Sequence, residues 1–315
     1  MTTQAKTISR TRKKDHSEQI YGFIFAGIPI LGFLVFDLIP MILSLIMSFA
    51  NLPTYRMGDM QLYDFEHLFT NYAAIFNDEK FGLSIVNTLI SLISLPISMF
   101  IGLILAVLLN NLKGAKIFRT IIFIPYVCSI VSISLMWRTM LNKQYGIINQ
   151  FLGIFGVPEI NWLGDPVAFR IAMVIMISWC NVGFSLILYS AALTAIDPTI
   201  YEAAEMGGSG KVHSFFHITL PLLSPTTFYL LVIGLIGGLQ EFARYQAINI
   251  KSNIVSPTGP NDAGLTIVFY LYNKAFNEAG GLGQASAVAW VLTLAIILIT
   301  AVNFSFRKRW VYDGD

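Results

Sequence analysis

Charged side chains are scarce in this chain of 315 residues. Asp, Glu, Lys and Arg make up 12% of it, against about 25% in a typical soluble domain. Apolar residues make up 55%, and the mean hydropathy is +0.67. So few charges exclude a soluble globular protein and a disordered chain. The chain has no basic stripe beyond short runs near its termini, which excludes nucleic acid as a partner.

Cysteine and histidine are also rare. Cys128 and Cys180 are the only cysteines, and both lie in apolar runs. Two cysteines so placed exclude a disulfide framework, and we expect two free thiols in the core. None of the four histidines lies within a predicted membrane span. This excludes a histidine-based intramembrane metal site and a histidine base for an intramembrane serine protease.

Long uncharged runs occupy most of the sequence. A bilayer core about 30 Å thick needs roughly 20 apolar residues for each helical span. We therefore predict an all-α membrane protein with six transmembrane helices, at about residues 20–48, 83–109, 117–140, 168–194, 221–241 and 284–306. A seventh apolar run, 263–273, is too short to cross and is predicted to be interfacial or re-entrant.

Lys and Arg predict the orientation of these spans. Basic clusters occur at 10–14, 113–119 and 307–309, which precede span 1, connect spans 2 and 3, and follow span 6. Because such clusters favour the cytoplasmic side, both termini are predicted to be cytoplasmic. Residues 1–19 then form a basic tail and residues 20–315 the transmembrane domain. The first apolar run is longer than the core of a signal peptide, so we expect it to be a retained anchor.

The predicted cytoplasmic loop between spans 4 and 5, residues 197–221, carries signals for helix ends. Asp197 is suited to cap a helix, and Pro198 to occupy its first position. The glycines at 207, 208 and 210 are expected to end that helix. A second helical turn over 211–218 then leads to Pro221 at the start of span 5. We interpret these capped helices as a surface that docks into another protein.

This loop resembles the EAA loop of binding-protein-dependent ABC importer permeases. The family pattern is Glu-Ala-Ala, three residues, Gly, nine residues and Ile-x-Leu-Pro. The matching positions are Glu202, Ala203, Ala204, Gly208, Ile218, Leu220 and Pro221. The resemblance covers most of the chain and is closest to the maltose-type oligosaccharide permeases. It implies that the loop sits in a cleft of a cytoplasmic ATPase, where Glu202 meets a basic group. The alternative for Glu202 is a solvated helix acid.

The resemblance implies a permease subunit of an ABC sugar importer in the cytoplasmic membrane of a prokaryote. Its partners would be a second permease, two copies of an ATPase and an extracytoplasmic sugar-binding protein, within membrane lipid. The chain itself would be no enzyme and hold no cofactor. Residues 207–212 look like a phosphate loop but fail the Walker A pattern at both ends, so ATP would be bound by a separate chain.

Sugars need hydrogen-bonding groups and a flat aromatic face. In span 4, Asn181 and Ser185 share a helical face and Phe184 lies beside it. By resemblance, the substrate path would include Cys180, Asn181, Phe184, Gly234, Gly237, Gly238 and Glu241. Glycines stand where the family has larger side chains, which indicates a roomier passage or a site supplied mainly by the partner permease. The alternative is that these residues only pack helices, as a Gly-xxx-Gly contact would.

Other transport functions remain open. A glycerol phosphate importer would favour Arg or Lys in the middle of a span, and a polyamine importer would favour several acids. Asp37 is the only acid inside a predicted span, and it could serve an ion-coupled secondary transporter. A lone acid with no basic or histidine partner in another span makes a weak proton relay. The identity of the sugar, its length and the partner subunits are left open by the sequence.

Overall fold

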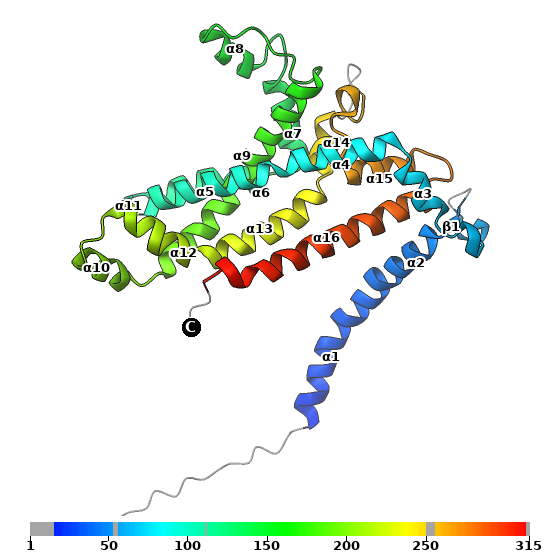
Figure 1. Ribbon diagram of the computed structural model, residues 1–315, viewed down its shortest axis with the longest axis horizontal. Coiled ribbons are helices and arrows are strands. Elements are labelled where there is room, and N and C mark those ends of the chain that lie inside the picture. Colours follow the sequence, from blue (N-terminus) through cyan, green and yellow to red (C-terminus); the bar gives the residue numbers. More distant parts are fainter. Residues whose placement is uncertain (1–15, 53–55, 111, 250–255, 313–315) are drawn as a thin grey trace, which may run out of the picture.

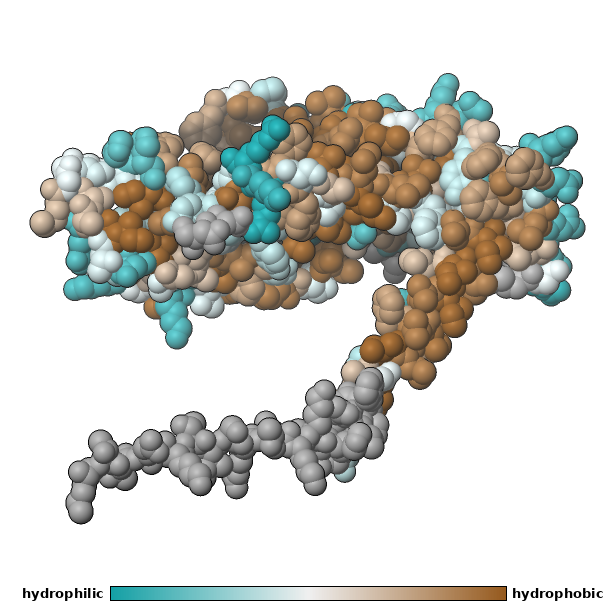
Figure 2. All heavy atoms as spheres, turned by 60° about the horizontal axis from the view of Figure 1, so that its bottom comes forward, coloured by the Kyte–Doolittle hydropathy of each residue, from teal (hydrophilic) through white to brown (hydrophobic). Residues whose placement is uncertain are grey.

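The computed structural model describes residues 16–52, 56–110, 112–249 and 256–312. The fold is mostly helical, as predicted, and its long helices form an elongated bundle (Figure 1). In the described part of the chain the only sheet is a small antiparallel pair, β1 (Ala50–Asn51) with β2 (Gln61–Leu62). Figure 2 shows one face, where hydrophobic residues dominate and hydrophilic residues lie toward both ends of the bundle and in one group near its middle.

An N-terminal arm extends away from the bundle (Figure 1). It consists of α1 (His16–Phe33), a π-helical turn (Leu34–Leu38) and α2 (Ile39–Ser48). Pro40 lacks the N–H that would continue the α-helical ladder, and the π turn just before it absorbs this defect without breaking the helix. Only the end of α2 packs on the bundle, against α16. The large apolar side chains of the arm, and Asp37, are therefore exposed.

Within the described residues, four helical stretches are long and apolar enough to cross a membrane: Phe25–Ser48, Glu79–Asn110, Pro166–Ala195 and Leu282–Trp310. The first is the arm, and the second joins α4 (Glu79–Leu92) to α5 (Ser94–Asn110). The other two are the single helices α9 (Pro166–Ala195) and α16 (Leu282–Trp310). Two bent helix pairs bring the number to six if each pair counts as one span.

The bent pairs depart from the straight spans that we predict. α6 (Ala115–Val127) and α7 (Ile130–Met140) meet at 97°, because Cys128 is extended directly after the proline-containing α6. Cys128 is therefore exposed at the bend, whereas Cys180 is buried as predicted and both are free thiols. The second pair, Lys211–Leu222 and α13 (Ser224–Leu239), bends by 57°.

Short helices gather at the end of the bundle opposite the 197–219 loop, and we call this the α15 end (Figure 1). They are η2 (Met57–Asp59), η3 (Phe65–His67), α3 (Thr70–Phe76), α14 (Ala243–Asn249), η5 (Pro260–Asp262) and α15 (Ile267–Phe276). α8 (Ile147–Ile154) projects from the bundle after α7. The apolar run 263–273 thus contributes α15, which packs against α4 and α16 and buries Phe269 and Tyr270.

α9 is the centre of the bundle and packs against α4, α5, α6 and α13. It is apolar all round, which is typical of a helix that is covered on most sides. Glycines bring its neighbours close, since a Cβ at Gly102 would lie 2.5 Å from the Cβ of Ser185. A Cβ at Gly183 would lie 2.5 Å from the carbonyl oxygen of Ile122. This packing places one face of α9 against a cavity.

Candidate functional site

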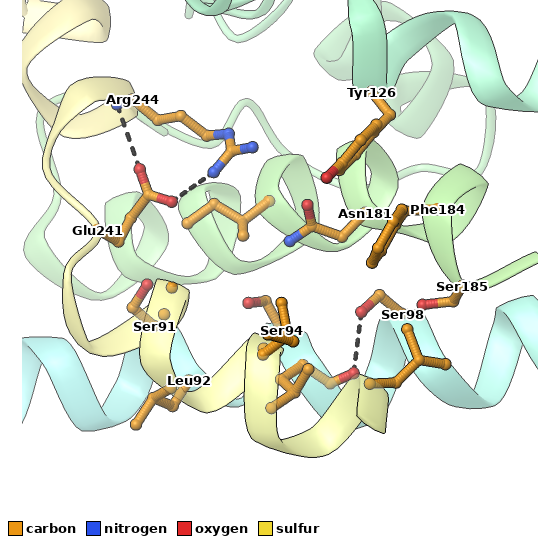
Figure 3. Close-up of a pocket in the computed structure, with 17 residues that line it drawn as sticks. Ser91, Leu92, Ser94, Ser98, Tyr126, Asn181, Phe184, Ser185, Glu241 and Arg244 are labelled. Atoms are coloured by element: carbon orange, nitrogen blue, oxygen red, sulfur yellow. Dashed lines mark hydrogen bonds and ion pairs between the residues drawn. The ribbon is translucent and has the colours of Figure 1, made fainter. Parts of the chain in front are cut away.

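A cavity of about 230 Å³ lies where α4, α5, α6, α9 and α13 meet (Figure 3). Its apolar wall consists mainly of leucine and isoleucine side chains and of glycines. Its polar and aromatic groups come from segments far apart in the sequence: Ser91, Ser94, Ser98, Tyr126, Asn181, Phe184, Ser185, Glu241 and Arg244. A small cavity with a few convergent polar groups is the usual form of a binding site for a small molecule.

The α9 wall presents the hydrogen-bonding and aromatic groups that we predict for a sugar path. Asn181, Phe184 and Ser185 all line the cavity, because positions three and four apart share one helical face. The ring of Phe184 stacks on Tyr126 of α6, with centroids 4.9 Å apart and planes 12° apart. Among the described residues, none is hydrogen-bonded to the Asn181 amide. That amide therefore keeps its hydrogen bonds for a solute or water.

Cys180 is placed differently from the other predicted residues of the path. It is 1% exposed and does not line the cavity, and it lies behind the wall beside Arg244. The α13 glycines all line the cavity but differ in what they meet. A Cβ at Gly238 would lie 2.6 Å from a methyl carbon of Leu92, and one at Gly234 would collide with Leu95. These two glycines allow close helix packing, and only Gly237 faces open space.

Arg244 is the charged residue of the cavity that sequence reasoning missed, and the polar and aromatic residues Ser91, Ser94, Ser98 and Tyr126 were missed as well. Arg244 lies on α14, in the segment that we predict to connect spans 5 and 6, yet its guanidinium pairs with the carboxylate of Glu241 (Figure 3). The Arg244 backbone N–H also donates to Oε1 of Glu241 at 3.3 Å. The Glu241 side chain is 10% exposed and the Arg244 side chain is 17% exposed. The i, i+3 spacing of opposite charges directly after a glycine-rich helix is the signal that could have identified the pair.

Hydrogen bonds hold the segment next to the cavity in place. Thr266 donates to the Glu241 carbonyl at 2.7 Å, and the Ile267 N–H donates to Thr88 of α4 at 3.0 Å. The buried Asn87 amide donates to the carbonyls of Asp262 and Leu265 at 2.8 and 3.0 Å. Its oxygen accepts from Nε of Arg170 at 2.9 Å. Together these bonds tie the turn that precedes α15 to α4, α9 and α13.

An ionic network lies at the start of α4. Tyr270 donates to Asp78 at 2.7 Å, and Lys274 lies 3.2 Å from the same carboxylate and 2.8 Å from Glu278. Partial burial opposes ionisation of Asp78, but hydrogen bonds from Tyr270, the Lys80 N–H and Lys274 outweigh it and lower its pKa. Partial burial also disfavours charged Lys274, but hydrogen bonds to Glu278 and Asp78 raise its pKa. Both groups are therefore stabilised in their charged forms.

The 197–219 loop forms the opposite end of the bundle, which we call the α10 end (Figure 1). α10 (Pro198–Met206) begins as predicted, since the Asp197 carboxylate accepts from the Thr199 N–H at 2.9 Å. This bond lowers the pKa of Asp197. Gly208 has φ of +81°, the left-handed conformation that ends the helix. Glu202, Ala203 and Met206 are exposed, and Ala204 is half-buried.

The second helical segment of the loop is longer than we predict. α11 (Lys211–Ser214), a π-helical turn (Phe215–Thr219) and α12 (Leu220–Leu222) run together as one helix before the bend at residue 223. Pro221 therefore lies inside a helix, because the π turn before it accommodates its missing N–H. Ile218 and Leu220 are half-buried, and Pro221 is exposed. The hydroxyls of Tyr201 and Thr219 are 3.0 Å apart and join the two segments.

Comparisons with known proteins agree with this architecture. Residues 98–310 match the family described as binding-protein-dependent transport system inner membrane component. The probable ABC transporter permease protein YesP of Bacillus subtilis is 32% identical over 309 residues, 96% of this chain and 94% of that protein. The lactose transport system permease protein LacF of Rhizobium radiobacter is 32% identical over 311 residues, 96% of this chain and 99% of that protein.

A solved structure is similar over nearly the whole chain. It is a bacterial ABC transporter involved in the import of the acidic polysaccharide alginate, with a TM-score of 0.77 and 26% identity. The match covers 93% of this chain and 96% of the solved chain. A second structure, of an alginate ABC transporter in complex with a periplasmic protein that holds an alginate pentasaccharide, matches equally well. The chain belongs to the inner membrane component family of binding-protein-dependent ABC transport systems.

Proposed function

We propose that this chain is one permease subunit of an ATP-driven sugar importer in the cytoplasmic membrane of a prokaryote. The observation that carries the proposal is the cavity on α9, which joins a free amide, several hydroxyls and a stacked aromatic pair inside the membrane-spanning bundle. Relatives named for lactose and for arabinooligosaccharides support a sugar as the solute. Glycerol 3-phosphate is the alternative, since a permease for it is 30% identical over 77% of this chain.

We infer that α10 couples the pore to a separate ATPase. Its capped helix, the left-handed Gly208 and the exposed Glu202 form a small projecting surface at one end of the bundle. In this arrangement six spans place both termini and α10 in the cytoplasm. The chain carries no ATPase chemistry of its own, and it binds no cofactor. Glu202, Ala203, Ala204 and Gly208 make the contact, while Ile218, Leu220 and Pro221 shape the return into α13.

Three kinds of partner complete the proposed importer. A second permease supplies the other half of the pore and covers the exposed arm of α1 and α2, where Asp37 would otherwise face lipid. Two copies of the ATPase bind the α10 ends of the two permeases. A sugar-binding protein docks at the α15 ends, on the extracytoplasmic side. Substrate-loaded binding protein and ATP together would then drive the pore between inward-facing and outward-facing states.

Reconstitution tests this function. The chain, its partner permease and the ATPase are placed in proteoliposomes with the sugar-loaded binding protein, and uptake of radiolabelled sugar is measured. We expect uptake that needs both ATP and the binding protein. Uptake by this chain alone, driven by an ion gradient without ATP, would instead establish a secondary transporter. ATP-dependent uptake of glycerol 3-phosphate but of no sugar would establish the alternative solute.

Thiol labelling tests the orientation. A cysteine that replaces Asn142, in the segment after α7, is expected to react with an impermeant reagent added to intact cells. A cysteine that replaces Ser209, directly after α10, is expected to react only after the cells are opened. The reverse pattern would show that α10 faces outward, where it could not contact an ATPase.

A further inference from the structure

The two charged side chains of the cavity form an ion pair with each other. Seventeen described residues line it, and Glu241 and Arg244 are the only two that carry charge. They pair through the guanidinium and again through the Arg244 backbone N–H. Both side chains are largely buried, where an unpaired charge is costly. The cavity is therefore electrically neutral as long as both members are present.

The partners around the pair keep it in place. The Glu241 carbonyl accepts from Thr266 at 2.7 Å, which anchors the turn between α13 and α14 to the start of α15. Arg244 sits only three residues later, so its guanidinium has a carboxylate within reach in this turn. A solute in the cavity thus meets both charges together and does not meet Arg244 alone.

This arrangement discriminates between solutes by their hydrogen-bonding chemistry. A sugar hydroxyl can accept from the remaining N–H groups of Arg244 and donate to the remaining lone pairs of Glu241. A fully ionised phosphate or carboxylate group can only accept, and it is repelled by Glu241 at the point where Arg244 would attract it. One solved relative imports an acidic polysaccharide, so the fold alone does not decide the charge of the solute.

We infer that Glu241 neutralises Arg244 in the solute cavity and thereby excludes anions, so that the path takes uncharged, hydroxyl-rich molecules. This inference rests on the proposed function, because it names the class of solute for the same cavity. It makes Glu241 a specificity residue whose removal exposes an attractive cation. Arg244 has the opposite effect, because its removal exposes a carboxylate.

Charged thiol reagents test the inference without a cognate sugar. Gly237 lines the cavity, and a Cβ there meets no atom within 4 Å. Gly237→Cys is introduced with Cys128→Ser and Cys180→Ser, in membranes that contain the assembled complex. The rates of reaction with sulfonatoethyl and trimethylammonioethyl methanethiosulfonate give an anion-to-cation ratio. The uncharged hydroxyethyl reagent reports access, and the ratio measured with free 2-mercaptoethanol in solution provides the reference.

With both charges present, the ratio at position 237 is expected to equal the reference. Glu241→Gln should raise it about tenfold, and Arg244→Gln should lower it by a similar factor, as expected for one unpaired charge nearby. The double variant should restore the parent ratio. If the Glu241→Gln complex does not assemble, the ratio measured in the Arg244→Gln variant tests the inference.

An unchanged ratio in both single variants overturns the inference, as does a parent ratio that already favours the anion about tenfold. Absence of reaction with the uncharged reagent also overturns it, because the cavity would then be closed to solutes. The rates require neither ATP nor sugar. A failure of uptake therefore counts against the proposed function alone, and a failure of these ratios counts against the inference alone.

Discussion

At the α10 end, a helix is specified by residues that lie within about a dozen positions of one another, whereas at the α15 end Asn87, Arg170 and Asp262 meet from three distant parts of the chain. The first end projects from the bundle and leaves Glu202 and Met206 exposed. The second joins its segments through buried hydrogen bonds. A locally formed, exposed helix can be changed without disturbing the bundle, so it is suited to a partner. The buried hydrogen bonds at the α15 end cannot be changed without disturbing the bundle, so they are suited to hold it together.

The largest expected effect comes from substitutions at the α10 end, which should reduce transport without affecting folding. Glu202→Lys should abolish sugar-stimulated ATP hydrolysis and uptake together, because two like charges would face each other in the proposed ATPase cleft. Gly208→Val should act similarly, since a β-branched residue resists the left-handed conformation. ATP hydrolysis by the reconstituted complex, with and without loaded binding protein, measures the loss.

Glu205→Lys is the matched control for that experiment. Glu205 is an exposed acid on the same helix, but unlike Glu202 it lines a groove with Tyr201 and Lys211. We expect it to retain most of the stimulation. An assembled Glu202→Lys complex with full stimulation would remove α10 from the coupling path.

The second effect is at the α15 end and on stability. Asn87→Ala removes three hydrogen bonds, one of them to a guanidinium, and leaves the buried carbonyl of Leu265 and the partly buried carbonyl of Asp262 without this donor. It should lower the free energy of unfolding by about 3 kcal/mol. Thermal unfolding of the purified chain in detergent measures this. Asn277→Ala, which breaks an exposed amide pair, should change stability by less than about 0.5 kcal/mol. Equal losses of unfolding free energy in the two variants would contradict the proposed difference between the buried Asn87 contacts and an exposed contact.

The third effect lies between the two ends. Asn181→Ala and Phe184→Ala should each slow uptake by about tenfold, which corresponds to 1–2 kcal/mol for one hydrogen bond or one stacking contact. Assembly of the complex should be unchanged. Thr194→Ala is the control, because Thr194 lies on α9, hydrogen-bonds only to its own helix and does not line the cavity. Normal uptake in both test variants would exclude these residues from the path.

The smallest effect depends on pH. Because the pKa of Asp78 is lowered in the fold, its contribution to stability is present above about pH 4 and is lost as pH falls through the folded pKa. The raised pKa of Lys274 gives a contribution that is present below about pH 10 and is lost as pH rises further. Asp78→Asn should therefore cost about 1 kcal/mol at pH 7.

Thermal unfolding of Asp78→Asn and the parent, followed from neutral to acid pH, checks this. The difference between them should shrink below about pH 4. Asp64→Asn is the control, since Asp64 precedes η3 without a capping hydrogen bond from its side chain. A pH-independent difference would show that Asp78 acts through packing and not through its charge.

Short-range signals predicted the α10 end well. The Asp197 cap, Pro198 in the first turn and Gly208 at the end of the helix act on neighbouring backbone groups, so their effect is readable without the fold. Long apolar runs likewise indicated most of the long helices. The 97° bend between α6 and α7 was missed, because an apolar run gives no sign of where its helix turns.

The sequence by itself determined that the chain is apolar and mostly helical and that it carries a capped loop, because composition, periodicity and capping act over a few residues. The permease function followed from the resemblance of that loop to the EAA loop. Only the tertiary structure decided what the cavity contains. It placed Arg244 against Glu241, seated Gly234 and Gly238 against leucines, and left Gly237 open. It also joined Asn87 to a turn about 175 residues later. These contacts depend on how helices pack, and side chains far apart in the sequence become neighbours only when the bundle forms.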